Sequence, residues 1–203
     1  MEVLTALFFL EKMGNYIKTA EVIIAEGKVR VNNEVVFQFD DSQENSVFLK
    51  EIYKDLDLAY PKFYKMDELC KLGVLAAEYL MRSKAIDQNY KPEDVALILS
   101  NSSSSLSTDT KHQESISDKD AYFPSPAVFV YTLANIVLGE IAIKFKFTGE
   151  QSFFIFEDYD ATFMESYAHG LLDNSEAECV IAGWVEIYEN NYKAILYTIE
   201  KAS

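Results

Sequence analysis

The chain has 203 residues, 49% of them hydrophobic, and a net charge of −15 at pH 7. This apolar content excludes a disordered chain, and the length allows one sizeable core but not two comfortable domains. The acidic balance weighs against a role dominated by phosphate contacts, because nucleic-acid binding draws its affinity from Lys and Arg. The simplest explanation of the negative net charge is that it keeps the protein soluble.

Composition also gives an expectation for the cellular compartment of the chain. No apolar run reaches the roughly 18 residues of a membrane helix. The first residues form a short apolar run, but they lack a basic segment and a small-residue cleavage site, so no signal peptide is predicted. Cys70 and Cys179 lie far apart without CxxC spacing, which predicts free, buried thiols in a cytoplasmic protein. No cofactor is predicted.

The first predicted element is a β-hairpin over residues 28–39. Apolar and polar residues alternate on both sides of Asn32-Asn33, a pair that tolerates the left-handed backbone of a tight turn. For residues 16–25, the sequence allows either a third strand or a helix. Residues 1–15 are interpreted as a loose extension of the domain.

Two helices are predicted next. Residues 46–58 carry apolar side chains at helical spacing, and Ser46 is the predicted N-cap. Residues 66–82 carry a longer apolar stripe, and Asp67 is predicted to cap that helix.

The middle of the chain alternates apolar and polar segments. Residues 95–100, VALILS, are typical of a strand buried on both faces. The serine-rich stretch after it has little to bury, and residues 101–122 are predicted to be a mobile loop. A helix over 126–138 is expected to end at Gly139, and the alternation over 141–147 predicts a half-buried strand.

The last third predicts a central strand over 152–156 and a helix over 161–171. A strand over 179–182 is expected to end at Gly183, and a final hairpin is expected to turn at 189–191. Strands that alternate with helices predict a layered α/β fold with a mostly parallel centre.

Two blocks of sequence carry a resemblance to a known family. One is the order of elements over residues 123–186, with a Pro-bounded helix, a Gly-Glu turn, the aromatic strand FFIF, a second helix and a Gly-ended apolar strand. The other is YKMD, KLG and AA over residues 64–77, before the VALILS strand. Both resemble the N-terminal half of the β-ketoacyl synthases, the condensing enzymes of fatty-acid and polyketide synthesis. The resemblance implies an α/β fold, half of the thiolase-like architecture, with a layered mixed β-sheet and packed helices. Residues 1–203 are therefore interpreted as a single domain.

The residue that would carry the family's activity is missing. Synthases of this family use a cysteine just after the aromatic strand, where a helix N-terminus lowers the thiol pKa. The resemblance places that position at Asp158, and between Gln151 and Ala161 the chain has no Cys, Ser or Thr except Ser152, which comes too early. Cys179 falls in a later strand and is interpreted as core. The chain also ends before the family's second half, which would hold the partner histidines.

The acidic residues of this segment have three interpretations. Glu157, Asp158 and Asp160 either form an acid–base set or cap the following helix, and capping is favoured. A divalent-cation site is the weakest interpretation, because adjacent carboxylates converge poorly, and no metal site is predicted. His112 and His169 are interpreted as surface or capping residues.

The N-terminal region is also similar to a small RNA-binding fold of ribosomal proteins and pseudouridine synthases. There an apolar helix leads into a Gly-Lys-Val-x-Val-Asn-Gly hairpin and presents Arg and Lys to RNA. Here the segment offers Lys18, between Glu21 and Glu26, and little else. The favoured interpretation makes residues 16–39 the edge strands of the synthase-like half, and an RNA-binding module remains an alternative.

The resemblance implies a subunit without catalysis. Chain-length factors resemble the synthases, lack the cysteine and work as dimers with an active partner. The chain is therefore interpreted as a pseudoenzyme of fatty-acid or aryl-polyene-type polyketide synthesis. An enzyme with altered acyl-thioester chemistry at Asp158 is the alternative.

The expected partner is a full-length β-ketoacyl synthase or a second copy of the chain. Phe153, Phe154, Ile155 and Phe156 lie where the family dimerises and are the predicted interface, with simple core packing as the alternative. An acyl carrier protein is a further candidate, although such carriers are usually acidic and would need a local basic patch here. Neither a membrane nor nucleic acid is expected as a partner.

Overall fold

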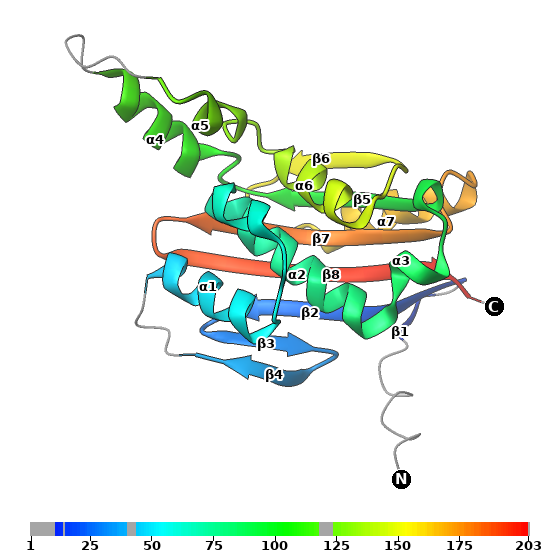
Figure 1. Cartoon of the computed structure of the whole chain (residues 1–203). Helices are drawn as coiled ribbons and strands as arrows, with labels where there is room; N and C mark the ends of the chain where they lie inside the picture. Colours follow the sequence, from blue (N-terminus) through cyan, green and yellow to red (C-terminus); the bar gives the residue numbers. More distant parts are fainter. Residues whose placement is uncertain (1–10, 14, 40–43, 118–123, 203) are drawn as a thin grey trace.

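A computed structural model gives the fold and describes residues 11–13, 15–39, 44–117 and 124–202. Figure 1 shows the arrangement of its strands and helices. In chain order, they are β1 (Glu11–Met13), β2 (Tyr16–Ala25), β3 (Lys28–Val31), β4 (Glu34–Gln38), α1 (Asn45–Asp55), the 3₁₀ turn η2 (Pro61–Lys65), α2 (Glu68–Lys84), α3 (Ile86–Asn89), the 3₁₀ turn η3 (Pro92–Asp94), β5 (Val95–Asn101), α4 (Leu106–Ser117), α5 (Pro126–Val130), α6 (Ile136–Phe145), β6 (Gln151–Ile155), α7 (Ala161–Asp173), β7 (Cys179–Tyr188) and β8 (Asn191–Lys201).

One mixed sheet contains all of the described strands. Its order is β4-β3-β2-β8-β7-β5-β6, and β1 pairs beside this path with β2. Strand β5 runs parallel to both β6 and β7, whereas the other pairs are antiparallel. The α/β class is confirmed, but the parallel part is a group of three strands at one side of the sheet and not its centre.

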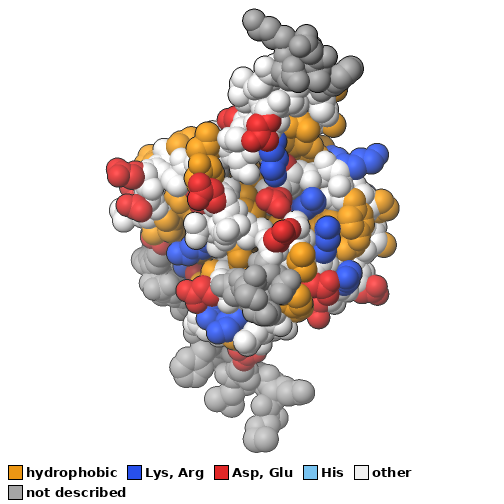
Figure 2. Space-filling view, turned by 90° about the vertical axis from the view of Figure 1, so that its left-hand side faces the viewer, with side chains coloured by type: hydrophobic (Ala, Val, Ile, Leu, Met, Phe, Trp, Pro, Cys, Tyr) orange, Lys and Arg blue, Asp and Glu red, His pale blue; other side chains and the backbone are white. Residues whose placement is uncertain are grey.

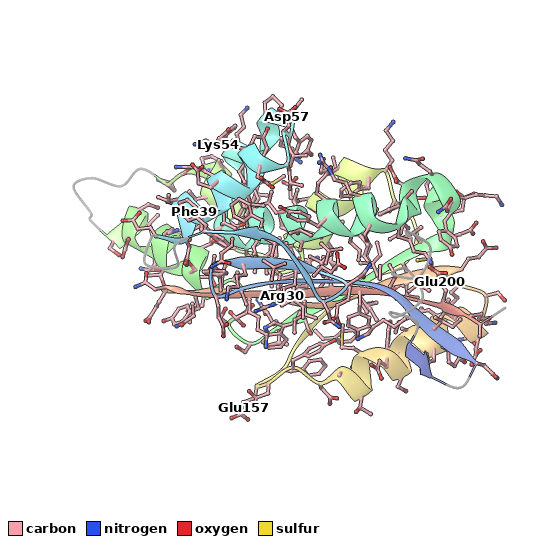
Figure 3. All side chains as sticks on the ribbon, turned by 90° about the horizontal axis from the view of Figure 1, so that it is seen from below. Arg30, Phe39, Lys54, Asp57, Glu157 and Glu200 are labelled. Atoms are coloured by element: carbon pink, nitrogen blue, oxygen red, sulfur yellow. The ribbon has the colours of Figure 1, made fainter. Side chains whose placement is uncertain are left out.

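Helices cover the two faces of the sheet unequally. Figure 3 shows the sheet from below, with α1 and α2 on one face and α7 on the other. Most side chains of α2 between Leu69 and Met81 are buried, because this helix lies between the sheet and the helices α1 and α6. The larger core, with Phe48 and Leu72, is on this face, and a smaller core with Met164 lies under α7.

The hairpin predicted over residues 28–39 is confirmed as β3 and β4. Asn32 and Asn33 have φ angles of 50° and 69°, the left-handed pair that a two-residue hairpin turn requires. Residues 16–25 form strand β2, which is hydrogen-bonded to both β3 and β8. The RNA-binding interpretation needed a helix in this place, so it is wrong. Strands β3 and β4 do form one edge of the sheet, while β2 lies inside it.

Both helices predicted after the hairpin exist. Helix α1 begins at Asn45, and no side chain caps it, so the predicted cap at Ser46 is wrong. Helix α2 is capped as predicted, because the Oδ1 atom of Asp67 accepts a hydrogen bond from the Cys70 N–H at 2.9 Å. Strand β5 is buried along its whole length, as its apolar sequence predicts. Among the described residues, no helix is long and apolar enough to cross a membrane.

The serine-rich stretch is not the loop that its composition predicts. Residues 106–117 form helix α4, which projects with α5 away from the sheet (Figure 1). Only Thr108 of α4 is buried. A helix that faces water needs few apolar residues, so its polar sequence looked like a loop. Residues 118–122 lie outside the described residues.

The secondary structure predicted for residues 126–147 is also wrong. The single helix expected over 126–138 is divided into α5 and α6, and α6 continues through Gly139 to Phe145. The strand predicted over 141–147 is therefore mostly helix. This run is so apolar that it fits both the two-residue period of a strand and the roughly 3.6-residue period of a helix. Periodicity alone therefore cannot separate a strand from a buried helix. In the helix, Ile143 points outward and is 62% exposed.

Strand β7 does not end at Gly183 but continues to Tyr188, and it forms the predicted hairpin with β8. A Cβ atom at position 183 would lie 1.9 Å from the backbone oxygen of Ile195 on β8. Glycine at this position allows β8 to lie close against β7. Gly183 is thus a close-packing residue inside a strand and not a strand terminator.

Candidate functional site

Strand β6 is the last strand at one edge of the sheet and not the central strand predicted. It pairs with β5 along one side, with Phe153 opposite Leu99. No strand of the described ranges pairs with its other side. Such an edge offers backbone N–H and C=O groups to another strand. The predicted interface segment is therefore open to pairing.

The side chains of this segment point to both faces of the sheet. Phe153 packs against the larger core, and Phe154 and Phe156 pack against the core under α7. All three are half-buried, whereas Ile155 is 50% exposed. Core packing therefore accounts for part of the aromatic content. The interface role stays a prediction. The groups available for it are mainly the backbone of the open strand edge and the side chain of Ile155.

An aromatic cluster fixes β6 to α7. The ring of Phe163 meets the rings of Phe154 and Phe156 edge-on, with centroids 5.0 and 5.1 Å away. Tyr167 meets Phe154 at 5.1 Å, and its hydroxyl lies 3.1 Å from Ser152 Oγ. Edge-on pairs of this kind stabilise beyond the area that they bury. The turn over residues 157–160 is thus held between a strand and a helix that are packed together.

The turn itself carries the predicted nucleophile position. Glu157 and Asp158 are exposed, and Figure 3 shows Glu157 pointing away from the body. Within the described residues, the Asp158 carboxylate makes no ion pair or hydrogen bond with another side chain. Asp160 caps α7, since its Oδ1 accepts a hydrogen bond from the Phe163 N–H at 2.9 Å. Capping is therefore confirmed for Asp160, and no acid–base pair is assembled around Asp158.

Two alanine substitutions separate these roles. Asp160→Ala is expected to lower the free energy of unfolding by about 1 kcal/mol, because the first turn of α7 loses its cap. Asp158→Ala, at an exposed position two residues earlier, is expected to change it by less than about 0.5 kcal/mol. Urea unfolding followed by circular dichroism measures both. Equal losses in the two variants would contradict the assignment.

A tyrosine pair that was not predicted from the sequence lies behind the turn. The Tyr159 hydroxyl donates a hydrogen bond to the Tyr197 hydroxyl at 2.8 Å, and the Tyr159 ring meets Trp184 edge-on at 5.8 Å. The Lys18 ammonium lies 4.4 Å from the centroid of the Tyr197 ring. These residues come from β2, the turn, β7 and β8. No local sequence pattern could have joined them.

Burial of this pair predicts a loss of stability at high pH. Burial raises the pKa of Tyr159 to about 12 and also raises the pKa of Tyr197. Unfolded tyrosine titrates near 10. Stability from Tyr159 is therefore complete below pH 10 and is lost as the pH rises toward 12, since the unfolded chain releases its proton first. Tyr159→Phe is expected to flatten this decline, as measured by urea unfolding at pH 9 to 11; an unchanged slope would contradict the argument.

The cysteines lie away from any reactive setting. Both are buried and free, as predicted. Burial, more than any neighbouring charge, raises the thiol pKa of Cys70 and of Cys179, and Cys179 Sγ lies 3.9 Å from Glu200 Oε1. A thiol with a raised pKa is a poor nucleophile at neutral pH. The interpretation of Cys179 as a core residue is confirmed.

The histidines do not complete a site either. His112 lies on α4 with its ring 5.5 Å from Phe129, and His169 lies on α7 and stacks on Tyr16 at 3.7 Å. Neither forms a hydrogen bond with the 157–160 turn among the residues that the structure describes. No group of three or more metal-ligating side chains is present in the same ranges.

No protein-family model and no curated protein matches the sequence. Solved structures do match it. The ishigamide ketosynthase/chain length factor aligns with a TM-score of 0.69 at 13% identity, over 93% of this chain and 63% of that one. A ketosynthase in complex with its chain length factor from Xenorhabdus doucetiae aligns with a TM-score of 0.61 at 13% identity, over 94% of this chain and 81% of that one. A β-ketoacyl synthase from Burkholderia phymatum STM815 gives a TM-score of 0.63 at 10% identity, over 94% and 60%.

The chain thus spans less than two thirds of the ishigamide and Burkholderia chains but four fifths of the Xenorhabdus one. The agreement extends over nearly the whole of this chain, beyond the two blocks in which the sequence resemblance is visible. At these identities the match concerns architecture. The chain therefore has the thiolase-like fold of the β-ketoacyl synthases and their chain length factors, as its sequence predicts.

Proposed function

We propose that this chain is a non-catalytic, chain-length-factor-like subunit that pairs with a full-length β-ketoacyl synthase. The observation that carries the proposal is the ketosynthase fold combined with a turn, residues 157–160, that contains no cysteine. Two of the similar solved structures are a ketosynthase/chain length factor and a ketosynthase in complex with its chain length factor. Fatty-acid or aryl-polyene-type polyketide synthesis is the proposed setting.

Strand β6 supports the manner of pairing. Its unpaired edge would extend the sheet into the partner subunit through backbone hydrogen bonds, as extended strands do when they add to an open edge. Phe154 and Phe156 hold the strand against α7, so the edge is rigid before the partner arrives. Acyl groups would reach the active partner from an acyl carrier protein.

The first test is the native mass of the tagged protein, purified from its own cells at natural expression. A stoichiometric complex with a cysteine-bearing synthase is expected, and the identity of that synthase would name the pathway to assay. A free monomer or a plain homodimer would refute the heteromeric proposal.

The alternative, acyl-thioester chemistry at Asp158, gains no support from the contacts of its carboxylate. It makes a different prediction, however. If the complex still assembles with Asp158→Ala and the pathway product is lost, Asp158 takes part in chemistry. Our proposal expects assembly and product formation to be unchanged.

A further inference from the structure

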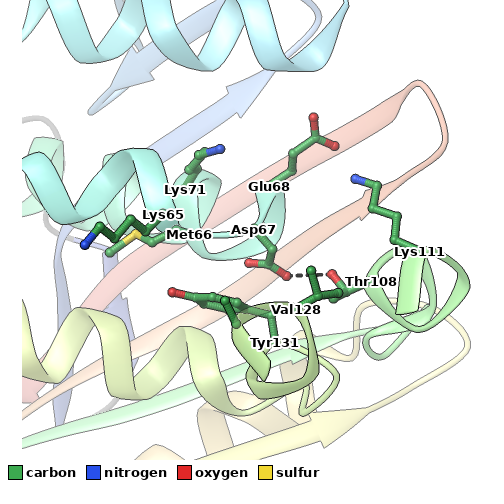
Figure 4. Close-up of a pocket in the computed structure, with 10 residues that line it drawn as sticks. Lys65, Met66, Asp67, Glu68, Lys71, Thr108, Lys111, Val128 and Tyr131 are labelled. Atoms are coloured by element: carbon green, nitrogen blue, oxygen red, sulfur yellow. Dashed lines mark hydrogen bonds between the residues drawn. The ribbon is translucent and has the colours of Figure 1, made fainter. Parts of the chain in front are cut away.

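A pocket of about 260 Å³ lies where α4 and α5 approach the beginning of α2. Figure 4 shows the side chains around it. Met66, Ala127, Val128 and Tyr131 supply apolar surface, and Met66 is buried. The pocket is on the opposite face of the sheet from the smaller core under α7. It is therefore separate from the turn after β6.

Three lysines line this pocket, and they come from three elements. Lys65 ends η2, Lys71 lies in the second turn of α2, and Lys111 lies on α4. Among the described side chains, no carboxylate lies within ion-pairing distance of any of the three. In a chain with 33 acidic and 18 basic residues, three unpaired lysines around one pocket call for an anionic occupant.

Lys71 is the least exposed of the three, and its ammonium lies 5.9 Å from the centroid of the Phe63 ring. It is half-buried, whereas Lys65 and Lys111 are exposed. Loss of hydration lowers the pKa of the Lys71 ammonium, because burial disfavours the charged form; the charges of Glu68 and Asp67 oppose this shift but do not cancel it. A bound anion at this position would relieve that cost.

The two carboxylates of the lining offset part of the positive charge, but among the described side chains neither forms an ion pair with a lysine of the pocket. Asp67 already accepts two hydrogen bonds, from the Cys70 N–H at 2.9 Å and from the Thr108 hydroxyl at 3.0 Å. Figure 2 shows the end of the molecule from which α4 and α5 project, with Lys and Arg side chains set among acidic and apolar ones. The charge of −15 is therefore not spread as a uniform negative surface.

We propose that this pocket binds a small organic anion with an apolar body, such as an aromatic or short aliphatic carboxylate. The apolar body would lie against Met66, Val128 and the ring of Tyr131. The anionic group would contact Lys71, and Lys65 and Lys111 would attract it at the opening. A small set of polar groups in a mainly apolar pocket is the usual composition of a small-molecule site. This proposal does not depend on the proposed subunit function.

The test compares 2-naphthoate with its neutral isostere 2-naphthamide. Methyl NMR of Met66 and Val128 reports binding at this pocket and not elsewhere. We expect saturable shifts with 2-naphthoate. We also expect the dissociation constant to rise about tenfold, both for 2-naphthamide on the unmodified chain and for 2-naphthoate on Lys71→Met, because each loses one charged hydrogen bond. The matched control is Lys54→Met, whose lysine pairs with Glu51 on α1; binding should be unchanged.

Three results would overturn the proposal: no saturable shift of the two methyl groups, equal affinity for the anion and the amide, or equal affinity of the unmodified chain and Lys71→Met. If Lys71→Met fails to fold, the double variant Lys65→Met/Lys111→Met replaces it. Both of its positions are exposed, so it should fold. Its affinity for 2-naphthoate should fall and its affinity for 2-naphthamide should not, and an unchanged affinity for 2-naphthoate would also overturn the proposal.

Discussion

Replacing Gly183 by alanine is expected to destabilise the fold by about 3–5 kcal/mol, or to prevent folding, because a side chain at this position overlaps the neighbouring backbone. The added Cβ would lie 1.9 Å from the backbone oxygen of Ile195 and 2.9 Å from its carbonyl carbon. Backbone atoms cannot rotate away as a side chain can. Strand β7 lies between β5 and β8, so a shift there propagates to both neighbours. Urea unfolding of the purified variant measures the loss.

The chain offers a matched control for this substitution. Gly170 lies on α7, and nothing is within 4 Å of a Cβ atom built there. Gly170→Ala should therefore be neutral or should stabilise the protein by up to about 1 kcal/mol, because alanine favours a helix. A similar loss in both variants would show that the close contact between β7 and β8 is not what requires glycine at position 183.

Replacing Ile155 by lysine is expected to abolish capture of the proposed synthase partner, or to weaken it at least about tenfold. Natural edge strands use lysine to prevent pairing with another strand. Ile155 is half exposed at the free edge, so the charged side chain would disturb the partner more than the fold. The measurement is the yield of partner with the tagged variant, followed by the dissociation constant of the purified pair.

Val36→Lys is the control for position 155. Val36 lies on β4, the opposite edge of the sheet, and is 48% exposed. Both variants should keep the circular dichroism spectrum of the unmodified chain, and Val36→Lys should keep the partner. If Ile155→Lys retained the partner, or Val36→Lys lost it, the assignment of β6 as the pairing edge would be wrong.

Local chemistry explains which parts of the fold could be predicted from sequence. The Asn32-Asn33 turn needs φ angles that few residue types adopt, so it was visible in the sequence. The cap at Asp67 and the apolar run of β5 are equally local signals. The capping interpretation of the acidic turn was correct for Asp160 for the same reason.

The wrong predictions have two causes. Some segments have a sequence that fits both a strand and a helix, and other features depend on contacts between elements that are distant in the chain. The run that forms α6 fits both the strand and the helix period, and its tertiary contacts with α2, β5 and β6 favour the helix. The edge position of β6 depends on the whole strand order, which no local pattern encodes. The Tyr159–Tyr197 pair and the pocket lined by Lys71 likewise join segments that are distant in the chain.

Strand β2 and strand β8 are hydrogen-bonded neighbours, with Val22 opposite Leu196, although they lie far apart in the sequence. During synthesis the hairpin of β3 and β4 therefore emerges well before β8, and the side of β2 that will face β8 stays unsatisfied until residues 191–201 leave the ribosome. Contacts between such distant residues make folding slow. The nascent chain is thus more exposed to aggregation until β8 has been made, and β8 then joins the early hairpin to the parallel strands in one sheet.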